Sequence, residues 1–149
     1  MKIGIGCDEA ALEMKNQLVE LLIQFGHEII DYGINDLTPV LYPDIALKTS
    51  RGVLSGECER AILLCGTGIG MSITANKIPG IRAALCHDVY SAERSRMSNN
   101  AQIITMGARV IGIELAKTII TAWLNAEFQG GRSAPKVNRI MEIEHQYHK

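Results

Sequence analysis

Two apolar stretches of the sequence end in groups that can do acid–base chemistry. Residues 2–7 are followed directly by Asp8 and Glu9, and residues 60–65 end at Cys65 and run into a glycine loop over residues 66–70. The backbone N–H groups of such a loop can converge on one small space and bind an anion. They also favour the thiolate form of a neighbouring cysteine. A thiolate beside such a nest suits proton abstraction next to a carbonyl, with the nest holding the enediolate oxygen.

The same residues also have a purely structural interpretation. A cysteine at the end of an apolar strand is more often a small core residue, and a glycine loop is more often a tight turn. Two other chemistries fit less well. A dinucleotide-binding loop would need a third glycine where Met71 stands, and a cysteine phosphatase would need an arginine in the loop beside Cys65. Spacing alone leaves proton abstraction and a structural turn both open.

Short apolar runs alternate with helical patterns along the chain, which is typical of a parallel α/β sheet. Strands are predicted at residues 2–7, 28–32, 60–65, 81–85 and 102–106. Helices are predicted at residues 9–25, 43–56, just after residue 70, and at about 89–98, 113–124 and 135–147. We therefore expect an α/β fold: a single doubly wound, Rossmann-like domain over residues 1–149, with helices on both faces of a five-stranded parallel sheet. Ligands bind such sheets at the carboxyl ends of the strands.

Composition narrows the class of protein. The chain has 149 residues, 47% of them hydrophobic, with 15 Lys and Arg against 16 Asp and Glu. This balance argues against a nucleic-acid partner. No apolar run approaches the roughly 18 residues of a membrane span, and Asp8 and Glu9 interrupt any signal peptide, so we expect a cytoplasmic protein without a membrane partner. The cysteines at 7, 58, 65 and 86 form no C-x-x-C pair, which predicts free thiols and no metal site.

A series of short motifs resembles the ribose-5-phosphate isomerase B family and the related galactose-6-phosphate isomerase subunits. The motifs cover nearly the whole chain, and their joint order and spacing carry the resemblance. They are G-C-D at 6–8, Y-P-D at 42–44, C-G-T-G-I-G at 65–70, A-N-K at 75–77, G-I-R-A at 80–83, S-A-x-x-S-R at 91–96, N-N-A at 99–101, G-A-R-V-I-G at 107–112 and E-F-Q-G-G-R at 127–132.

The resemblance implies a cofactor-free and metal-free aldose–ketose isomerase of a phosphorylated sugar, acting through an enediol. Carried over by motif, Cys65 is the base, Thr67 and the loop N–H groups stabilise the enediolate, and Asp8 binds substrate hydroxyls. The other substrate contacts implied are Glu9, Gly66, Gly68, Ile69, Gly70, Ser98 and Asn99, and the phosphate contacts are Arg109, Arg132 and Lys136. The resemblance also implies a homodimer or homotetramer whose pockets are shared between two subunits.

Three positions depart from the family's usual pattern. Glu9 and Ser98 stand where the family usually has histidines, and Lys136 replaces an arginine. Lysine binds phosphate as a point charge rather than as a bidentate clamp, so we expect looser phosphate geometry. A carboxylate near phosphate is unfavourable unless paired, so we expect Glu9 to pair with one of the phosphate-binding cations or to contact a sugar hydroxyl. His87, after the fourth predicted strand, can approach the crevice.

Ser98 bears on the choice of substrate. In the family, the histidine at that place is thought to open the furanose ring by protonating the ring oxygen, and serine is a poor general acid. A tetrose phosphorylated at O4 cannot close a furanose, so erythrose 4-phosphate and erythrulose 4-phosphate need no such group. Ribose 5-phosphate and ribulose 5-phosphate remain equally open, with His87 or a water opening the ring.

Two hypotheses from other classes also remain. The departures at Glu9 and Ser98 are compatible with a low-activity partner subunit of a heteromeric isomerase. They are also compatible with a sugar-phosphate-binding module that has lost turnover.

Overall fold

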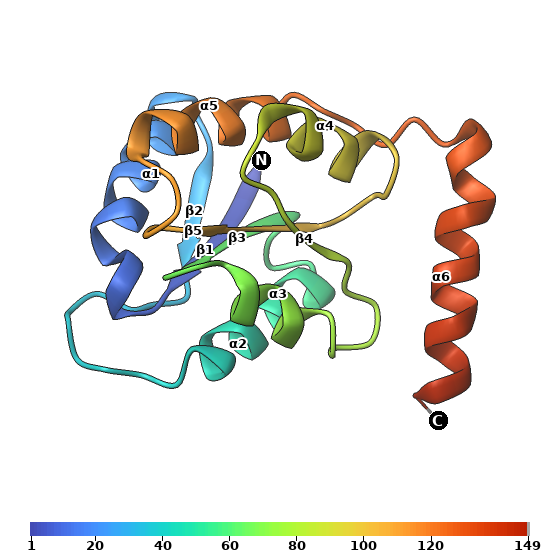
Figure 1. Ribbon diagram of the computed structural model, residues 1–149, viewed down its shortest axis with the longest axis horizontal. Coiled ribbons are helices and arrows are strands. Elements are labelled where there is room, and N and C mark those ends of the chain that lie inside the picture. The colour runs from blue at the N-terminus through green and yellow to red at the C-terminus, as the bar shows by residue number, and fades with distance from the viewer. Residues whose placement is uncertain (149) are drawn as a thin grey trace.

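The computed structural model describes residues 1–148, which form an α/β fold around one sheet of five parallel strands (Figure 1). The sheet has the order β2-β1-β3-β5-β4. Its strands are β1 (Lys2–Cys7), β2 (Glu28–Asp31), β3 (Arg60–Cys65), β4 (Ala83–Leu85) and β5 (Ile103–Gly107). The predicted α/β class and the predicted five-stranded parallel sheet are confirmed.

Helices cover both faces of this sheet. One face carries α1 (Leu12–Gln24), α4 (Val89–Met97) and α5 (Ile113–Leu124), and the other carries α2 (Tyr42–Ser55) and α3 (Ile69–Ala75) (Figure 1). Every residue of the central strand β3 is buried, as its unbroken apolar run requires of a parallel strand covered on both faces. None of the helices formed by residues 1–148 has the length and apolar character to cross a membrane.

The direction of the connections opens a crevice between β1 and β3. The helix after β1 is α1, on one face of the sheet, whereas the helix after β3 is α3, on the opposite face. The two strands are direct neighbours, with Cys7 opposite Leu64. Chains that leave adjacent parallel strands toward opposite faces mark the switch point at which α/β sheets bind ligands.

Local capping explains where α1 begins and ends. The predicted helix over residues 9–25 begins as a 3₁₀ turn, η1 (Glu9–Ala11), because the Asp8 carboxylate accepts a hydrogen bond from the Ala10 N–H at 3.1 Å. At the other end, Gly26 has φ = +87°, and the N–H groups of Gly26 and His27 bond back to Ile23 and Leu22. This is a Schellman motif, for which glycine is suited. The other predicted elements agree with the structure to within about two residues at each end.

The last helix stands apart from the rest of the fold. The short turn η2 (Gly131–Ser133) leads into α6 (Ala134–Tyr147), which projects beside the layered part of the molecule (Figure 1). Its Glu144 carboxylate accepts a bond from the Gly80 N–H at 2.9 Å. Val137 is buried, whereas Ile140 and Ile143 are more than two-fifths exposed. The helix therefore touches its own chain along one narrow line.

Candidate active site

Cys65 is the residue around which the candidate site is built. It ends β3 at the carboxyl edge of the sheet and keeps 5% of its surface exposed. Its Sγ accepts a hydrogen bond from the Gly68 N–H at 3.1 Å. The glycine loop therefore directs a hydrogen-bond donor at the sulfur atom.

The loop after Cys65 is held by close backbone packing. Gly68 has φ = +78°, and a Cβ on it would lie 2.8 Å from the Met106 carbonyl carbon. The Gly68 carbonyl accepts a bond from the buried Thr105 hydroxyl at 2.9 Å. On the other side, a Cβ on Gly107 would lie 2.6 Å from the Thr67 Cα. Glycine is required at both positions for the loop to lie on β5, and this fixes the direction of the Gly68 N–H.

Asp8 and Arg109 bring opposite charges to the same edge. The Asp8 N–H donates to the Leu64 carbonyl at 3.2 Å, and the Arg109 N–H donates to the Gly66 carbonyl at 3.0 Å. The Arg109 guanidinium lies over Gly66, 3.4 Å from where a Cβ would stand. Burial and the neighbouring Glu9 raise the pKa of the Asp8 carboxyl, while Arg109 lowers it. One carboxylate and one cation therefore flank the loop beside Cys65.

Glu9 points toward the segment that follows β2. Its Oε2 accepts a hydrogen bond from the Val40 N–H at 3.3 Å. The carboxylate thereby holds the 33–41 segment beside Asp8, and its negative charge acts on the Asp8 carboxyl. Its pairing with a phosphate-binding cation or a sugar hydroxyl stays a prediction.

Two side chains that the sequence predictions did not assign to the site lie beside the loop. The Gly107 N–H donates to Nε2 of His87 at 2.9 Å, and Gly107 is the strand partner of Cys65. The Tyr42 ring packs so closely on Gly70 that a Cβ there would overlap it. Sequence gave a partial signal for each, since His87 follows a strand end and Tyr42 lies in the Y-P-D motif. The contacts themselves depend on the tertiary fold.

The His87 bond fixes what this ring can do. A nitrogen that accepts a hydrogen bond from a backbone N–H carries no proton, so Nε2 is the bare nitrogen and Nδ1 carries the hydrogen. His87 therefore lies beside Gly107, the strand partner of Cys65.

The other three cysteines lie in the core. Burial raises the pKa of the Cys7 thiol and that of the Cys86 thiol to about 11, and it also raises the pKa of Cys58. Each is at most 2% exposed. All four are free thiols, as expected. Among residues 1–148, no cluster of three or more His, Cys, Asp and Glu is placed to hold a metal ion.

Four of the predicted site residues lie at the opposite edge of the sheet. Ser98 and Asn99 follow α4 after it has returned toward the amino ends of the strands, and the Arg94 Nε donates to the Ser98 hydroxyl at 2.8 Å. Arg132 lies in η2, and Lys136 lies in the first turn of α6. At about 3.3 Å per residue, the six-residue β3 separates the two edges by roughly 16 Å. One chain therefore brings together Cys65, Thr67, Asp8 and Arg109, and holds the other four apart.

The edge around Cys65 is open. Thr67 is exposed, and half of the Ile69 surface is accessible. Asn99 instead lines a separate cavity of about 260 Å³ together with Tyr90 and Arg94. A second cavity of about 280 Å³ lies between α1 and α5, and Cys65 does not line it. The loop residues Thr67 and Ile69 beside Cys65 are therefore accessible to another molecule.

Comparison with known proteins places this geometry in a family. The profile of the Ribose/Galactose Isomerase family matches residues 3–140. The chain is 55% identical over 148 residues to a D-erythrulose-4-phosphate isomerase of Pectobacterium atrosepticum, covering 98% of this chain and 97% of that protein. It is 53% identical to a ribose-5-P isomerase B of Listeria innocua, covering 97% of each chain. The structure of Clostridium thermocellum ribose-5-phosphate isomerase B superposes with a TM-score of 0.97 at 50% identity and 99% coverage of each chain.

Proposed function

The chain belongs to the Ribose/Galactose Isomerase family and is an isomerase of phosphorylated sugars, and we propose that it interconverts erythrose 4-phosphate and erythrulose 4-phosphate with Cys65 as the base. The hydrogen bond from the Gly68 N–H to the Cys65 sulfur is the observation that carries the mechanism. It supports a thiolate at the switch point of the sheet, beside a nest of further N–H groups.

The chemistry is a proton shuttle between two adjacent carbons. The Cys65 thiolate takes the proton from C2 of the aldose, and the C–H electron pair forms the C1–C2 double bond of an enediolate. The loop N–H groups and the Thr67 hydroxyl stabilise the oxyanion that develops on the former carbonyl oxygen. The thiol then returns a proton to C1, which regenerates the thiolate. The C2 hydroxyl proton passes to the O1 oxyanion as the C2 carbonyl forms, which gives the ketose. Asp8 accepts hydrogen bonds from substrate hydroxyls and orients the chain of the sugar.

Three observations favour a tetrose over a pentose. Ser98 offers no general acid for opening a ring, and its hydroxyl is already bonded to Arg94. The proton-free Nε2 of His87 is occupied by the Gly107 N–H, so His87 is a poor substitute acid. The likeness to an enzyme named for erythrulose 4-phosphate agrees with this choice. The comparably close likeness to a ribose-5-P isomerase B keeps ribose 5-phosphate as the second candidate.

We further propose that two chains build each site. Within one chain, Arg132 and Lys136 lie at the edge opposite Cys65, so a second chain must bring its own pair over the first chain's loop for phosphate and base to meet. The open edge around Ile69 leaves room for that second chain. A homodimer is the smallest assembly that completes the site.

Turnover of purified protein with several phosphorylated sugars tests the function. We expect a higher kcat/KM for erythrulose 4-phosphate than for ribulose 5-phosphate, and we expect Ser98→His to improve pentose turnover. A clear preference for the pentose, or no gain in Ser98→His, rejects the tetrose assignment. No turnover of any sugar phosphate by the purified chain alone would favour the partner-subunit or binding-module alternatives.

Mixing two inactive variants tests the shared site. Cys65→Ala and Arg132→Ala each remove one half, and we expect each homodimer to be impaired. Dimers formed from both variants hold one intact site, so co-expression should restore up to about a quarter of the wild-type activity. No recovery in a preparation shown to contain mixed dimers contradicts a site built from two chains.

A further inference from the structure

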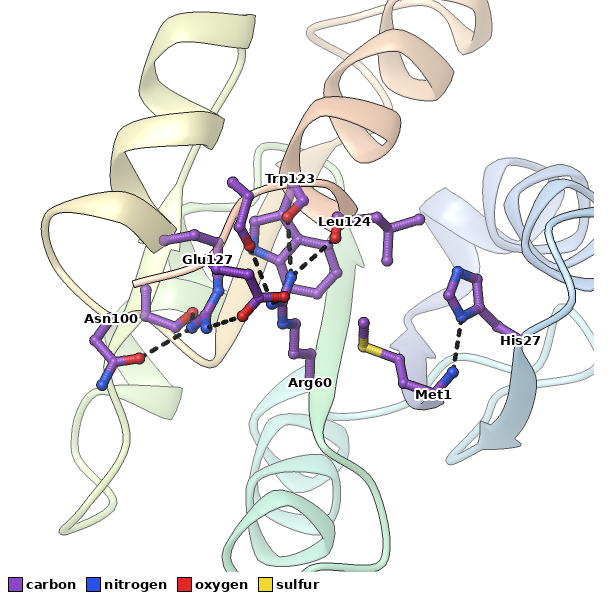
Figure 2. Close-up of polar contacts among 10 residues, drawn as sticks. Met1, His27, Arg60, Asn100, Trp123, Leu124 and Glu127 are labelled. Carbon is purple, nitrogen blue, oxygen red and sulfur yellow. Dashed lines mark hydrogen bonds and ion pairs between the residues drawn. The ribbon is translucent and has the colours of Figure 1, made fainter. Parts of the chain in front are cut away.

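The amino-terminal edge of the sheet holds a second polar cluster, built on Arg60 (Figure 2). Arg60 begins β3 and is only 4% exposed. Its Nη1 donates to the carbonyls of Trp123 and Leu124 at 3.0 and 3.3 Å, and its Nη2 donates to the Ala126 carbonyl at 3.0 Å. The guanidinium carbon also lies 5.6 Å from the centre of the Trp123 ring. Arg60 therefore caps the end of α5 from inside the core.

Glu127 bridges Arg60 to a second buried cation. Its Oε1 lies 2.6 Å from Arg60 Nη2, and its Oε2 lies 3.9 Å from Arg96 Nη2. Arg96, in the last turn of α4, donates through Nη1 to the Ala101 carbonyl at 2.8 Å and to Asn100 Oδ1 at 3.2 Å. Burial and the positive charge of Arg60 lower the pKa of Arg96, and Glu127 raises it. The carboxylate therefore compensates two guanidinium groups that repel each other.

The bridge joins the two segments that carry the distant half of the site. The turn over residues 98–101 holds Ser98 and Asn99, and the loop over residues 125–131 leads directly into Arg132. The Gln129 N–H donates to the Met97 carbonyl at 3.1 Å and makes a second link between the same segments. The spacing between Asn99 and Arg132 is thus set through these two links.

We propose that Glu127 is a positioning residue, which sets the distance between the sugar-binding turn and the phosphate-binding turn. This inference rests on the proposed roles of Asn99 and Arg132 in the site. Arg60 anchors the loop of residues 125–131 to β3, Arg96 anchors the turn of residues 98–101 to α4, and Glu127 locks the two anchors together. The strand β3 therefore carries the base at one end and the anchor of the distant half-site at the other.

The backbone contacts of Arg60 separate this role from a purely stabilising one. The Glu127 side chain is 72% exposed but its two cations are buried, so removing its charge lowers the free energy of unfolding to some extent. Arg60 keeps three backbone carbonyl acceptors when the carboxylate is removed. Loss of the Glu127 charge should therefore loosen the spacing of the two turns without unfolding the chain.

Glu127→Gln in the full-length protein tests the proposal, with inorganic phosphate as a competitive probe of Arg132 and Lys136. We expect about a tenfold rise in both the KM for the phosphorylated substrate and the Ki for inorganic phosphate, because small misplacements of binding groups are costly. We expect kcat per folded molecule to stay within about threefold, and the Tm to fall because two buried guanidinium groups lose their counter-charge. Glu127→Asp, which keeps the charge on a shorter side chain, should fall between the wild type and Glu127→Gln. Glu114→Gln is the matched control, since Glu114 is an exposed carboxylate paired with Lys117 on α5, and its KM and Ki should equal those of the wild type.

Failure of the positioning role and failure of the proposed function give different experimental results. Unchanged KM and Ki in Glu127→Gln overturn the positioning role, whether or not the Tm falls, because a purely structural residue lowers the amount of active protein without altering affinity. A Glu114→Gln variant that weakens phosphate as much as Glu127→Gln overturns it as well. Wild-type protein that turns over no sugar phosphate contradicts the proposed function itself, which is a separate result.

Discussion

Two cysteines end neighbouring strands of the same sheet, and their surroundings differ in burial and in hydrogen-bond partners. Cys7 ends β1 and Cys65 ends β3, and the register pairs Cys7 with Leu64 rather than with Cys65. Side chains alternate between the faces of a strand, so the one-residue offset turns the two thiols toward opposite faces. Cys7 packs into the core beneath α1 and α5, whereas Cys65 faces the side on which the glycine loop and α3 begin.

The two thiols also differ in the backbone groups that lie next to them. The Cys7 thiol has a backbone carbonyl, that of Ile34, as its neighbour at 4.0 Å, which can accept only from a protonated sulfur. The Cys65 sulfur instead accepts the Gly68 N–H. Burial is the largest cause of the raised pKa of Cys7, whereas the Gly68 N–H places a hydrogen-bond donor against the sulfur that we propose as the base.

Alkylation should separate the two thiols most strongly. With a pKa of about 11, only about one Cys7 thiol in a thousand is ionised at pH 8. Iodoacetamide at pH 8 should therefore modify Cys65 and abolish activity before Cys7 or Cys86 reacts, as followed by peptide mass spectrometry. Faster modification of Cys7 in the folded protein would reverse the comparison.

Removal of the Cys65 thiol should lower turnover, whereas removal of the Cys7 thiol should not. Cys65→Ala removes the proposed base, and we expect kcat to fall by at least ~10²-fold, the low end for a general base. Cys7→Ala is the matched control, which should lose some stability from the core cavity and keep its kcat per folded molecule. Near-wild-type turnover in Cys65→Ala rules out the assignment.

Moving the Gly68 N–H away from the sulfur should lower turnover without changing Cys65 itself. Gly68→Ala introduces a Cβ 2.8 Å from the Met106 backbone at φ = +78°, which shifts the N–H away from the sulfur. Gly56→Ala has nearly the same φ, +80°, with nothing within 4 Å of its Cβ. Gly56→Ala should lose about 1 kcal/mol of stability to backbone strain. Gly68→Ala should lose more, because its Cβ also overlaps the Met106 backbone, as measured by thermal unfolding. Per folded molecule, only Gly68→Ala should lose about tenfold or more in kcat. Equal kcat values for the two variants would show that the Gly68 donor is unimportant.

The smallest expected effect concerns the acid limb of the pH profile. Glu9 raises the pKa of Asp8, and in the proposed mechanism the ionised form of Asp8 accepts hydrogen bonds from substrate hydroxyls. Activity is therefore lost as the pH falls through the Asp8 pKa, and Glu9→Gln, which lowers that pKa, should move the acid limb of kcat/KM to lower pH. Glu13→Gln, on α1, serves as the control and should leave the limb in place. A shift to higher pH in Glu9→Gln contradicts the assignment of this limb to Asp8.

The strands and most of the helices could be predicted from the sequence, because apolar runs, helical periodicity and capping residues are local features. The unbroken apolar run of residues 60–65 predicts a buried central strand, and Gly26 marks the end of α1. The predicted start of a regular helix at residue 9 was wrong in its first turn, because Asp8 caps a 3₁₀ turn rather than an α-helix. The candidate site at the end of β3 could also be predicted, since a cysteine before a five-residue loop with three glycines is a local signal.

The contacts that complete the site depend on tertiary packing. No local pattern states that the His87 ring accepts the Gly107 N–H, or that Tyr42 covers Gly70. The distance between Cys65 and Arg132 depends on the path of α4 and of the 125–131 loop, which no local pattern specifies. The family resemblance implied only that two subunits share each pocket. The offset that turns Cys7 away from the site depends on strand register, which a single sequence does not fix.

The fate of deuterium at C2 of the substrate tests the central claim most directly. Erythrose 4-phosphate labelled with deuterium at C2 is incubated with wild-type, Cys65→Ala and Cys7→Ala protein, and the label at C2 is followed by NMR. If Cys65 is the base, wild-type and Cys7→Ala protein remove the deuterium during turnover. Cys65→Ala should retain it at C2 at least ~10²-fold longer, even where competition shows that the sugar is bound. Removal of the C2 deuterium by Cys65→Ala at close to the wild-type rate would contradict the account.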